Sequence, residues 1–191
     1  FLADIDADAE RFYSEQLPYE ALHIVNSGCN LGCSYCVSYY GDEHRKSAAT
    51  EAVRGDARDD AVLAVVDQFM QRKRAHGHTS ATIAFNGGEI LLRFPLVKRL
   101  LEYVSTAYKG IELNVSMNTN GTLLTPEISA LLAMYQTKVH VSVDGYKESH
   151  DGTRHYHVGG GSFDKVMAGV ANYREATGSP DTLRGFQGTI E

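Results

Sequence analysis

The chain has 191 residues, of which 43% are hydrophobic and 22% charged, and this composition is typical of one soluble globular domain. Its formal net charge of −6 disfavours nucleic-acid binding, because the chain lacks the positive field that attracts a phosphate backbone. No apolar run approaches the ~18 residues of a membrane span, and the acidic N-terminus lacks the basic region of a secretory signal. We therefore expect a cytoplasmic protein with neither a nucleic-acid nor a membrane partner.

The three cysteines of the chain are clustered at Cys29, Cys33 and Cys36. An odd number of cysteines in one loop is a poor disulfide framework, because one thiol is left over. The C-x3-C-x2-C spacing favours thiolates around a soft metal centre in a reducing compartment. The spacing leaves three alternatives. A zinc ion would need a fourth ligand, which would be His23, His44 or a distant histidine. An iron–sulfur cluster would keep one iron without a protein ligand. The thiols could also be unligated.

Apolar periodicity predicts four strand–helix pairs in chain order, followed by a fifth strand. Strands are expected at residues 22–26, 82–85, 111–117 and 139–143, and from about Leu183. Helices are expected from about Asp59, Pro95, Thr125 and Ser162, and a long polar loop at residues 37–57. This alternation predicts an α/β fold with parallel strands, arranged either as a doubly wound sheet or as a barrel.

A polar or Gly-rich segment follows each of the first four predicted strands. These segments are the cysteine loop and residues 87–89, 118–121 and 142–145. Parallel strands place their carboxyl ends at one edge of the sheet, where ligands bind, so the four segments are expected to form one site. The nearby His150, His155 and His157 lie in a Gly-rich polar stretch, and we expect them to be solvated.

These segments resemble the motifs of radical S-adenosylmethionine (SAM) enzymes. Residues 29–36 (CNLGCSYC) match that family's C-x3-C-x-aromatic-C signature, and residues 87–89 (GGE) match its motif after the second strand. Residues 118–122 (NTNGT), 141–145 (VSVDG), 150–154 (HDGTR) and 160–163 (GGSF) are similar to the branch that modifies peptides and proteins. That branch includes anaerobic sulfatase-maturing enzymes and the SPASM-type maturases of ribosomal peptides (RiPPs).

The resemblance implies a partial (βα)6 TIM-like radical SAM barrel, here truncated after about the fifth strand. It implies an N-terminal segment at residues 1–20 and a radical SAM core at residues 21–191. Relatives in that branch usually carry a cysteine-rich C-terminal extension with auxiliary clusters, whereas this chain has no cysteine after Cys36. We therefore expect the remainder of the barrel, or a second chain, to cover the open edge of the sheet.

The resemblance also implies cofactors and a reaction. The family's 4Fe–4S cluster would be held by Cys29, Cys33 and Cys36, and its open iron would bind SAM. One electron, from a donor such as flavodoxin or ferredoxin, would cleave SAM to a 5′-deoxyadenosyl radical. That radical would abstract a hydrogen from a peptide or protein substrate. No residue of this chain is assigned to catalysis beyond the cluster and SAM sites.

The remaining motif positions would bind SAM. They are Tyr35, Gly87, Gly88, Glu89, Asn120, Ser142 and Arg154. The two glycines would let the backbone approach the methionine moiety, since neither has a Cβ, and Glu89 would accept from the ammonium. Ser142 and Arg154 map to contacts with the carboxylate, which suits a guanidinium fork. Asn120 maps to the ribose side, and Tyr35 to the adenine.

Two alternative functions fit the same residues. One is a zinc-binding or degenerate module that binds a peptide without catalysis. The other is a radical SAM enzyme that acts on a small molecule or nucleoside. Metal analysis separates the first alternative from an iron–sulfur enzyme, and affinity for a peptide separates the second from a maturase.

Overall fold

The structure, a computed structural model, describes residues 21–36, 56–178 and 183–187. Its elements in chain order are β1 (Ala21–Asn26), α3 (Asp56–Ala75), β2 (Ser80–Gly87), the short 3-10 helix η1 (Ile90–Arg93), α4 (Phe94–Ala107), β3 (Glu112–Thr119), α5 (Pro126–Met134), β4 (Lys138–Ser142), α6 (Lys147–Thr153), α7 (Phe163–Thr177) and β5 (Leu183–Gln187). The predicted alternation of strands and helices is confirmed, and α6 is an additional helix. Segment 1–20 and most of the predicted loop at 37–57 lie outside the described residues.

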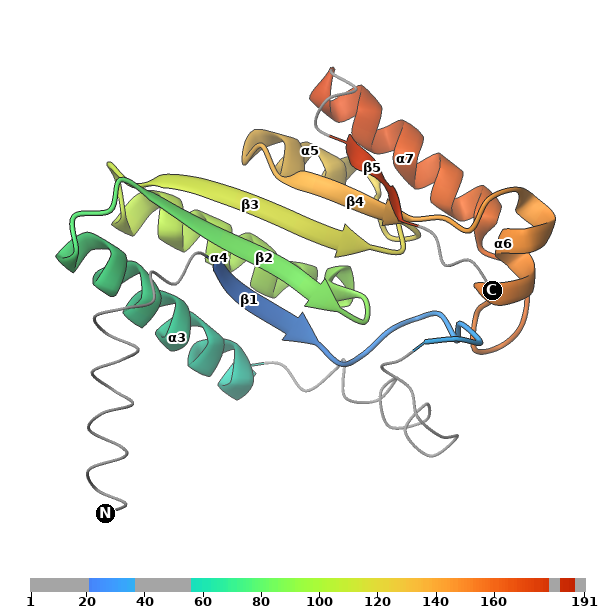
Figure 1. Cartoon of the computed structure of the whole chain (residues 1–191), viewed down its shortest axis with the longest axis horizontal. Coiled ribbons are helices and arrows are strands. Elements are labelled where there is room, and N and C mark those ends of the chain that lie inside the picture. Colours follow the sequence, from blue (N-terminus) through green and yellow to red (C-terminus); the bar gives the residue numbers. More distant parts are fainter. Residues whose placement is uncertain (1–20, 37–55, 179–182, 188–191) are drawn as a thin grey trace, which may run out of the picture.

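The five strands form one sheet in the order β1-β2-β3-β4-β5, and each neighbouring pair is parallel. Right-handed crossovers between sequential strands place the helices on one face, and Figure 1 shows α4 and α5 behind the strands. A doubly wound sheet would reverse its strand order, so that alternative is excluded. A sheet wound in one direction is part of a barrel, which is the other arrangement that the alternation allowed and the one that the resemblance implied.

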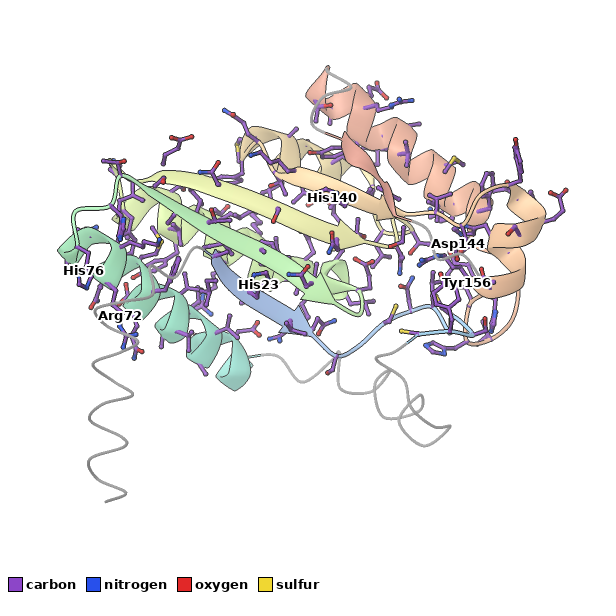
Figure 2. All side chains as sticks on the ribbon, in the orientation of Figure 1. His23, Arg72, His76, His140, Asp144 and Tyr156 are labelled. Atoms are coloured by element: carbon purple, nitrogen blue, oxygen red, sulfur yellow. The ribbon has the colours of Figure 1, made fainter. Side chains whose placement is uncertain are left out.

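The two faces of the sheet differ in polarity, because successive side chains of a strand point to opposite sides. The face under the helices carries the buried side chains of Ile24, Ile83, Phe85, Val115, Met117, Val139 and Val141. The other face carries the exposed or half-buried side chains of His23, Asn86, Asn118, His140 and Ser142. Figure 2 marks His23 on β1 and His140 on β4. The polar face is therefore the inner side of the partial barrel.

Local sequence signals explain where the helices begin. Thr125 accepts a hydrogen bond from the Ile128 N–H at 3.2 Å, and Pro126 follows it, as predicted for an N-cap. Ser162 occupies the N-cap position of α7, but its hydroxyl does not cap the helix. The cap is Asp151 instead, whose carboxylate accepts from the Phe163 N–H at 2.8 Å.

All strands point their carboxyl ends toward the same edge of the sheet, where α6 and the segment after β1 lie (Figure 1). Asp144 and Tyr156 lie at this edge, whereas Arg72 and His76 lie at the opposite end of the molecule (Figure 2). None of the helices within the described ranges is long and apolar enough to cross a membrane. The fold thus gathers the predicted motifs at one edge.

Candidate functional site: a cysteine loop held by three strand ends

The cysteine loop directly follows β1 and forms a small apolar cluster of its own. Cys29 is 9% exposed and Cys33 is 7% exposed, and both pack with the buried Leu31. Tyr35, Cys36 and Tyr156 are half-buried around them. All three cysteines are free thiols. The loop therefore presents buried sulfur at the edge of the sheet where ligands of such folds bind.

The thiols lie in a buried environment that supplies N–H donors to sulfur. Burial raises the pKa of Cys29 to about 11 and also raises the pKa of Cys33. Such thiols stay neutral unless a metal displaces their protons. The Cys29 Sγ also accepts from the Leu31 N–H at 3.5 Å and from the Asn120 amide at 3.7 Å. N–H donors of this kind tune thiolates that bind iron–sulfur clusters.

A single zinc ion would need a fourth ligand beside the three cysteines. Four tetrahedral ligands at about 2.3 Å from zinc must lie close to one another. Among the residues that the structure describes, no three His, Cys, Asp or Glu side chains are grouped closely enough to hold one metal ion. Of the candidate fourth ligands, His23 contacts Asn86 at 2.9 Å, and His44 lies outside the described residues. Among the distant histidines, the His157 ring lies beside the loop, 3.1 Å from the Cys29 carbonyl oxygen.

The GGE segment lies directly against the start of the cysteine loop. The Gly88 N–H donates to the Asn26 carbonyl at 2.7 Å, and the Glu89 N–H donates to the Gly28 carbonyl at 2.7 Å. A Cβ on Gly88 would lie 2.2 Å from the Gly28 oxygen, and one on Gly87 would lie 2.3 Å from the Asn26 oxygen. The glycines are thus required for contact between two backbones. Their approach to SAM stays a prediction.

Glu89 is completely buried and joins the ends of β2 and β3. Its Oε1 accepts from the Leu91 N–H at 3.0 Å, and its Oε2 accepts from the Asn120 N–H at 2.7 Å. The Thr119 hydroxyl lies 2.9 and 2.8 Å from the two oxygens. Burial raises the pKa of this carboxyl despite these donors. The carboxylate therefore has a structural role here, and its contact with the SAM ammonium stays a prediction.

Asn120 reaches from the end of β3 into the cysteine loop. Besides its contact with the Cys29 sulfur, its amide donates to the Asn30 oxygen at 2.8 Å. Its own side-chain oxygen accepts from the Thr122 N–H at 3.0 Å and from the Thr122 hydroxyl at 2.6 Å. Asn120 is therefore more than a turn residue. Its contact with the ribose is untested and stays a prediction.

The far side of the cysteine loop pairs with the segment after α6. The backbone contacts are an antiparallel bridge between Leu31 and Tyr156, a bond from the Gly32 N–H to the His155 carbonyl at 2.8 Å, and one from the Ser34 N–H to the Thr153 carbonyl at 3.1 Å. The His157 ring lies 3.1 Å from the Cys29 carbonyl oxygen. The connection between β4 and α7 thus holds the loop from the side opposite to the GGE segment.

Asp144 gathers three donors at one carboxylate oxygen. Its Oδ2 accepts from the Tyr35 hydroxyl, from the Thr153 hydroxyl at 2.9 Å and from the Arg154 Nε at 2.9 Å. The guanidinium of Arg154 also lies 5.4 Å from the centre of the Tyr35 ring. Two predicted SAM contacts are thereby brought together. Asp144 was predicted only as part of a segment at this edge, and nothing in its spacing indicates this role.

The prediction that the three histidines are solvated is wrong for His150. It is buried on α6, where its ring accepts from the Asp144 N–H at 3.3 Å and lies 2.9 Å from the Ser162 hydroxyl. Burial lowers the pKa of His150 and so favours the neutral ring. His155 is half-buried and His157 is exposed. The sequence did not predict α6, because its residues KESHDGT show no helical periodicity of apolar side chains. The burial of His150 was therefore not predicted either.

Ser142 lies at the end of β4, half-buried on the polar face of the sheet. Its backbone pairs with Gln187 of β5. In the described ranges, no hydrogen bond joins its side chain to Arg154. The two predicted carboxylate contacts therefore lie at the same edge without a hydrogen bond between them, and the role of Ser142 stays a prediction.

Comparison with known proteins places this chain in a family. Residues 23–186 match the profile of the Radical SAM superfamily. The chain is 33% identical over 144 residues to a cysteine-type anaerobic sulfatase-maturating enzyme of Clostridium perfringens, covering 74% of this chain and 37% of the relative. It is 29% identical over 153 residues to a serine-type enzyme of Bacteroides thetaiotaomicron, covering 80% and 35%. An AdoMet-dependent heme synthase of Methanosarcina barkeri is 32% identical over 155 residues, covering 80% and 38%.

Solved structures agree with the sequence relatives. The structure of anSMEcpe with bound AdoMet and the Cp18Cys peptide has a TM-score of 0.66 at 27% identity, covering 82% of this chain and 40% of that one. The same protein with AdoMet alone has a TM-score of 0.67 at 28% identity, covering 82% and 41%. The chain thus spans well under half the length of these relatives. It belongs to the radical SAM superfamily, whose cofactors are a 4Fe–4S cluster and S-adenosylmethionine.

Proposed function

We propose that this chain is the cluster- and SAM-binding core of an enzyme that cleaves SAM reductively and takes a hydrogen atom from a peptide or protein. The observation that carries the proposal is the cysteine loop, whose buried thiols are held between Glu89 and Asn120 on one side and the segment after α6 on the other. The proposed core is residues 21–191, in a reducing compartment such as the cytoplasm.

The cysteines would hold the cluster, and the surrounding residues would orient SAM. When bound, the cluster and SAM supply one-electron cleavage of the sulfonium. The guanidinium of Arg154 would bind the SAM carboxylate, because a planar fork of N–H donors matches two carboxylate oxygens. Tyr35, Asn120 and Ser142 would contact other parts of SAM. Flavodoxin or ferredoxin would deliver the electron.

A peptide or protein substrate is supported by the relatives. Two of them are named as sulfatase-maturating enzymes, and one solved neighbour has a peptide bound.

A second candidate is a radical SAM reaction on a small molecule. The similarity to the AdoMet-dependent heme synthase favours it, because that relative is matched at an identity close to that of the maturases. The two candidates share the cluster and the SAM site and differ only in the substrate. A peptide-binding measurement therefore separates them.

The proposal is tested by anaerobic reconstitution with iron and sulfide, followed by SAM and dithionite. Wild-type protein should hold iron and sulfide and release 5′-deoxyadenosine. Cys33→Ala should lose both, whereas Ser34→Ala, an exposed position in the same loop, should keep both. Bound zinc without sulfide, or no 5′-deoxyadenosine from cluster-loaded protein, contradicts the enzyme. A peptide substrate should be chemically modified by the cluster-loaded enzyme with SAM and dithionite, and SAM alone should not modify it.

A further inference from the structure

We propose that Asp144 is a positioning residue that fixes Arg154 and Tyr35 relative to each other, and so couples the SAM site to the cysteine loop. The inference rests on the proposed function. Its basis is geometric, because one carboxylate oxygen accepts from both side chains. Tyr35 belongs to the loop between Cys33 and Cys36, whereas Arg154 follows α6.

The charge of Asp144 is compensated where it lies. Its side chain is 3% exposed and that of Arg154 is 11% exposed, so the ion pair is largely removed from water. A buried carboxylate is tolerated only when it is paired and hydrogen-bonded, and Arg154, Tyr35 and Thr153 meet this need together. Loss of the negative charge would leave the guanidinium without its anchor.

The pairing through Nε sets the orientation of Arg154. A guanidinium is planar and carries five N–H donors, of which the bond to Asp144 uses the one on Nε. This bond and the Tyr35 ring, whose centre lies 5.4 Å from the guanidinium, together restrain the guanidinium plane. The same plane carries the Nη donors that a second carboxylate can bind as a fork. Asp144 thereby restricts the guanidinium before any ligand arrives, which lowers the entropy lost on binding.

Asp144 is itself held from α6. Its backbone N–H donates to the His150 Nδ1 at 3.3 Å, and the other ring nitrogen of His150 lies 2.9 Å from the Ser162 hydroxyl. The Ser162 hydroxyl donates in turn to the Arg154 carbonyl at 2.7 Å. Backbone and side chain of the Asp144–Arg154 pair are thus both fixed by the same helix connection.

The test is the variant Asp144→Asn in cluster-loaded, full-length protein. The charge is removed while the shape is kept, so iron and sulfide content should stay at the wild-type level. The dissociation constant for SAM, measured by equilibrium dialysis without reductant, should rise about tenfold, as expected from loss of one charge-assisted hydrogen bond. The change that SAM causes in the electron paramagnetic resonance spectrum of the reduced cluster should weaken in parallel.

Asp151→Asn is the matched control. Asp151 lies in the same connection, caps α7 through the Phe163 N–H and pairs with Lys147 at 3.1 Å, and among the described residues no hydrogen bond or ion pair joins it to Arg154. This variant should keep the wild-type SAM affinity. An equal loss in both variants would show that Asp144 only supports the fold, and would overturn the inference.

A double-mutant cycle with Arg154→Gln tests whether Asp144 acts through Arg154. If it does, Asp144→Asn adds less than about twofold to the dissociation constant in the Gln background. If the two substitutions instead raise the dissociation constant by independent factors that multiply, the inference is overturned. It is also overturned if Asp144→Asn binds SAM with wild-type affinity.

If Asp144→Asn loses its cluster, the variant Tyr35→Phe provides the test instead. It removes only the hydroxyl donor and should raise the dissociation constant about threefold, whereas no rise overturns the inference. Wild-type protein that holds a cluster and binds no SAM overturns the proposed function itself.

Discussion

The backbone N–H of Asn120 donates to the carboxylate of Glu89 at 2.7 Å and so joins the carboxyl ends of β2 and β3. The side chain of Asn120 then reaches the Cys29 sulfur at 3.7 Å. A continuous line of contacts therefore runs from a completely buried carboxylate to a predicted cluster ligand. Changes at Glu89 are expected to act first on the fold of this edge.

Replacing Glu89 by Gln should destabilise the protein by about 1–3 kcal/mol, because the Gln amide cannot accept from both the Leu91 and the Asn120 N–H groups. One buried donor is left without an acceptor. The measurement is the free energy of unfolding by urea for the cluster-free protein. Glu102→Gln, at an exposed position of α4, is the control and should change it by less than about 0.5 kcal/mol.

The stability difference between wild type and Glu89→Gln should also depend on pH. The pKa of Glu89 in the folded state is raised above the ordinary value of 4.5, mainly by burial. As pH rises above that value, the unfolded state releases its proton first, so wild-type stability falls until the folded-state pKa is passed. The Gln variant has no such proton. The stability advantage of wild type over Glu89→Gln should therefore shrink as pH rises. An advantage that grows with pH would contradict the raised pKa of Glu89.

The thiols of the cluster-free protein should differ in reactivity. With a pKa of about 11, only about one Cys29 thiol in a thousand is ionised at pH 8, and the side chain is buried. Iodoacetamide should therefore modify the half-buried Cys36 first and Cys29 last, with the Cys29 rate rising as pH approaches 11. Peptide mapping by mass spectrometry measures the order. Cluster-loaded protein should be protected at all three positions, and equal rates at Cys29 and Cys36 would show an open loop.

Sequence patterns predicted the α/β fold and the edge where the motifs meet, because strand periodicity and polar strand ends are local features. They did not predict α6, since its residues lack an apolar face, and they therefore misplaced His150. The bond between Tyr35 and Asp144 joins positions 109 residues apart. Such contacts depend on strand register and loop path, which no local pattern contains.

The sequence analysis predicted that Gly88 allows the backbone to approach SAM, whereas the structure shows that it allows close contact with the Gly28 backbone. A Cβ at this position meets the Gly28 oxygen at 2.2 Å, so Gly88→Ala should force the GGE segment away from the cysteine loop and cost about 1–3 kcal/mol. Gly152→Ala, in α6 with no atom within 4 Å of the added Cβ, should be neutral or stabilising by up to about 1 kcal/mol. Thermal unfolding and iron content measure both variants.

A different result at Gly88 would separate the two reasons. If Gly88→Ala keeps its stability and its iron but loses SAM affinity, the glycine serves the approach of SAM and not the contact with Gly28. If stability and iron fall together, the contact between the two backbones explains the requirement. The prediction from the structure is the second outcome, because the clash is with a backbone oxygen rather than with a movable side chain.

Asn120→Ala should lower the reduction potential of the cluster. The Asn120 amide donates toward the Cys29 sulfur, and such a donor stabilises the more electron-rich, reduced state. One hydrogen bond of about 0.5–1.5 kcal/mol corresponds to about 20–60 mV for a one-electron couple. The reduction potential should therefore fall by no more than this amount. Redox titration followed by electron paramagnetic resonance measures it in protein of matched iron content. Asn114→Ala, within β3, the strand that ends just before Asn120, has no hydrogen bond to a cysteine among the described residues and should leave the potential unchanged. An equal shift in both variants, or a rise in Asn120→Ala, would mean that the 3.7 Å contact does not tune the sulfur.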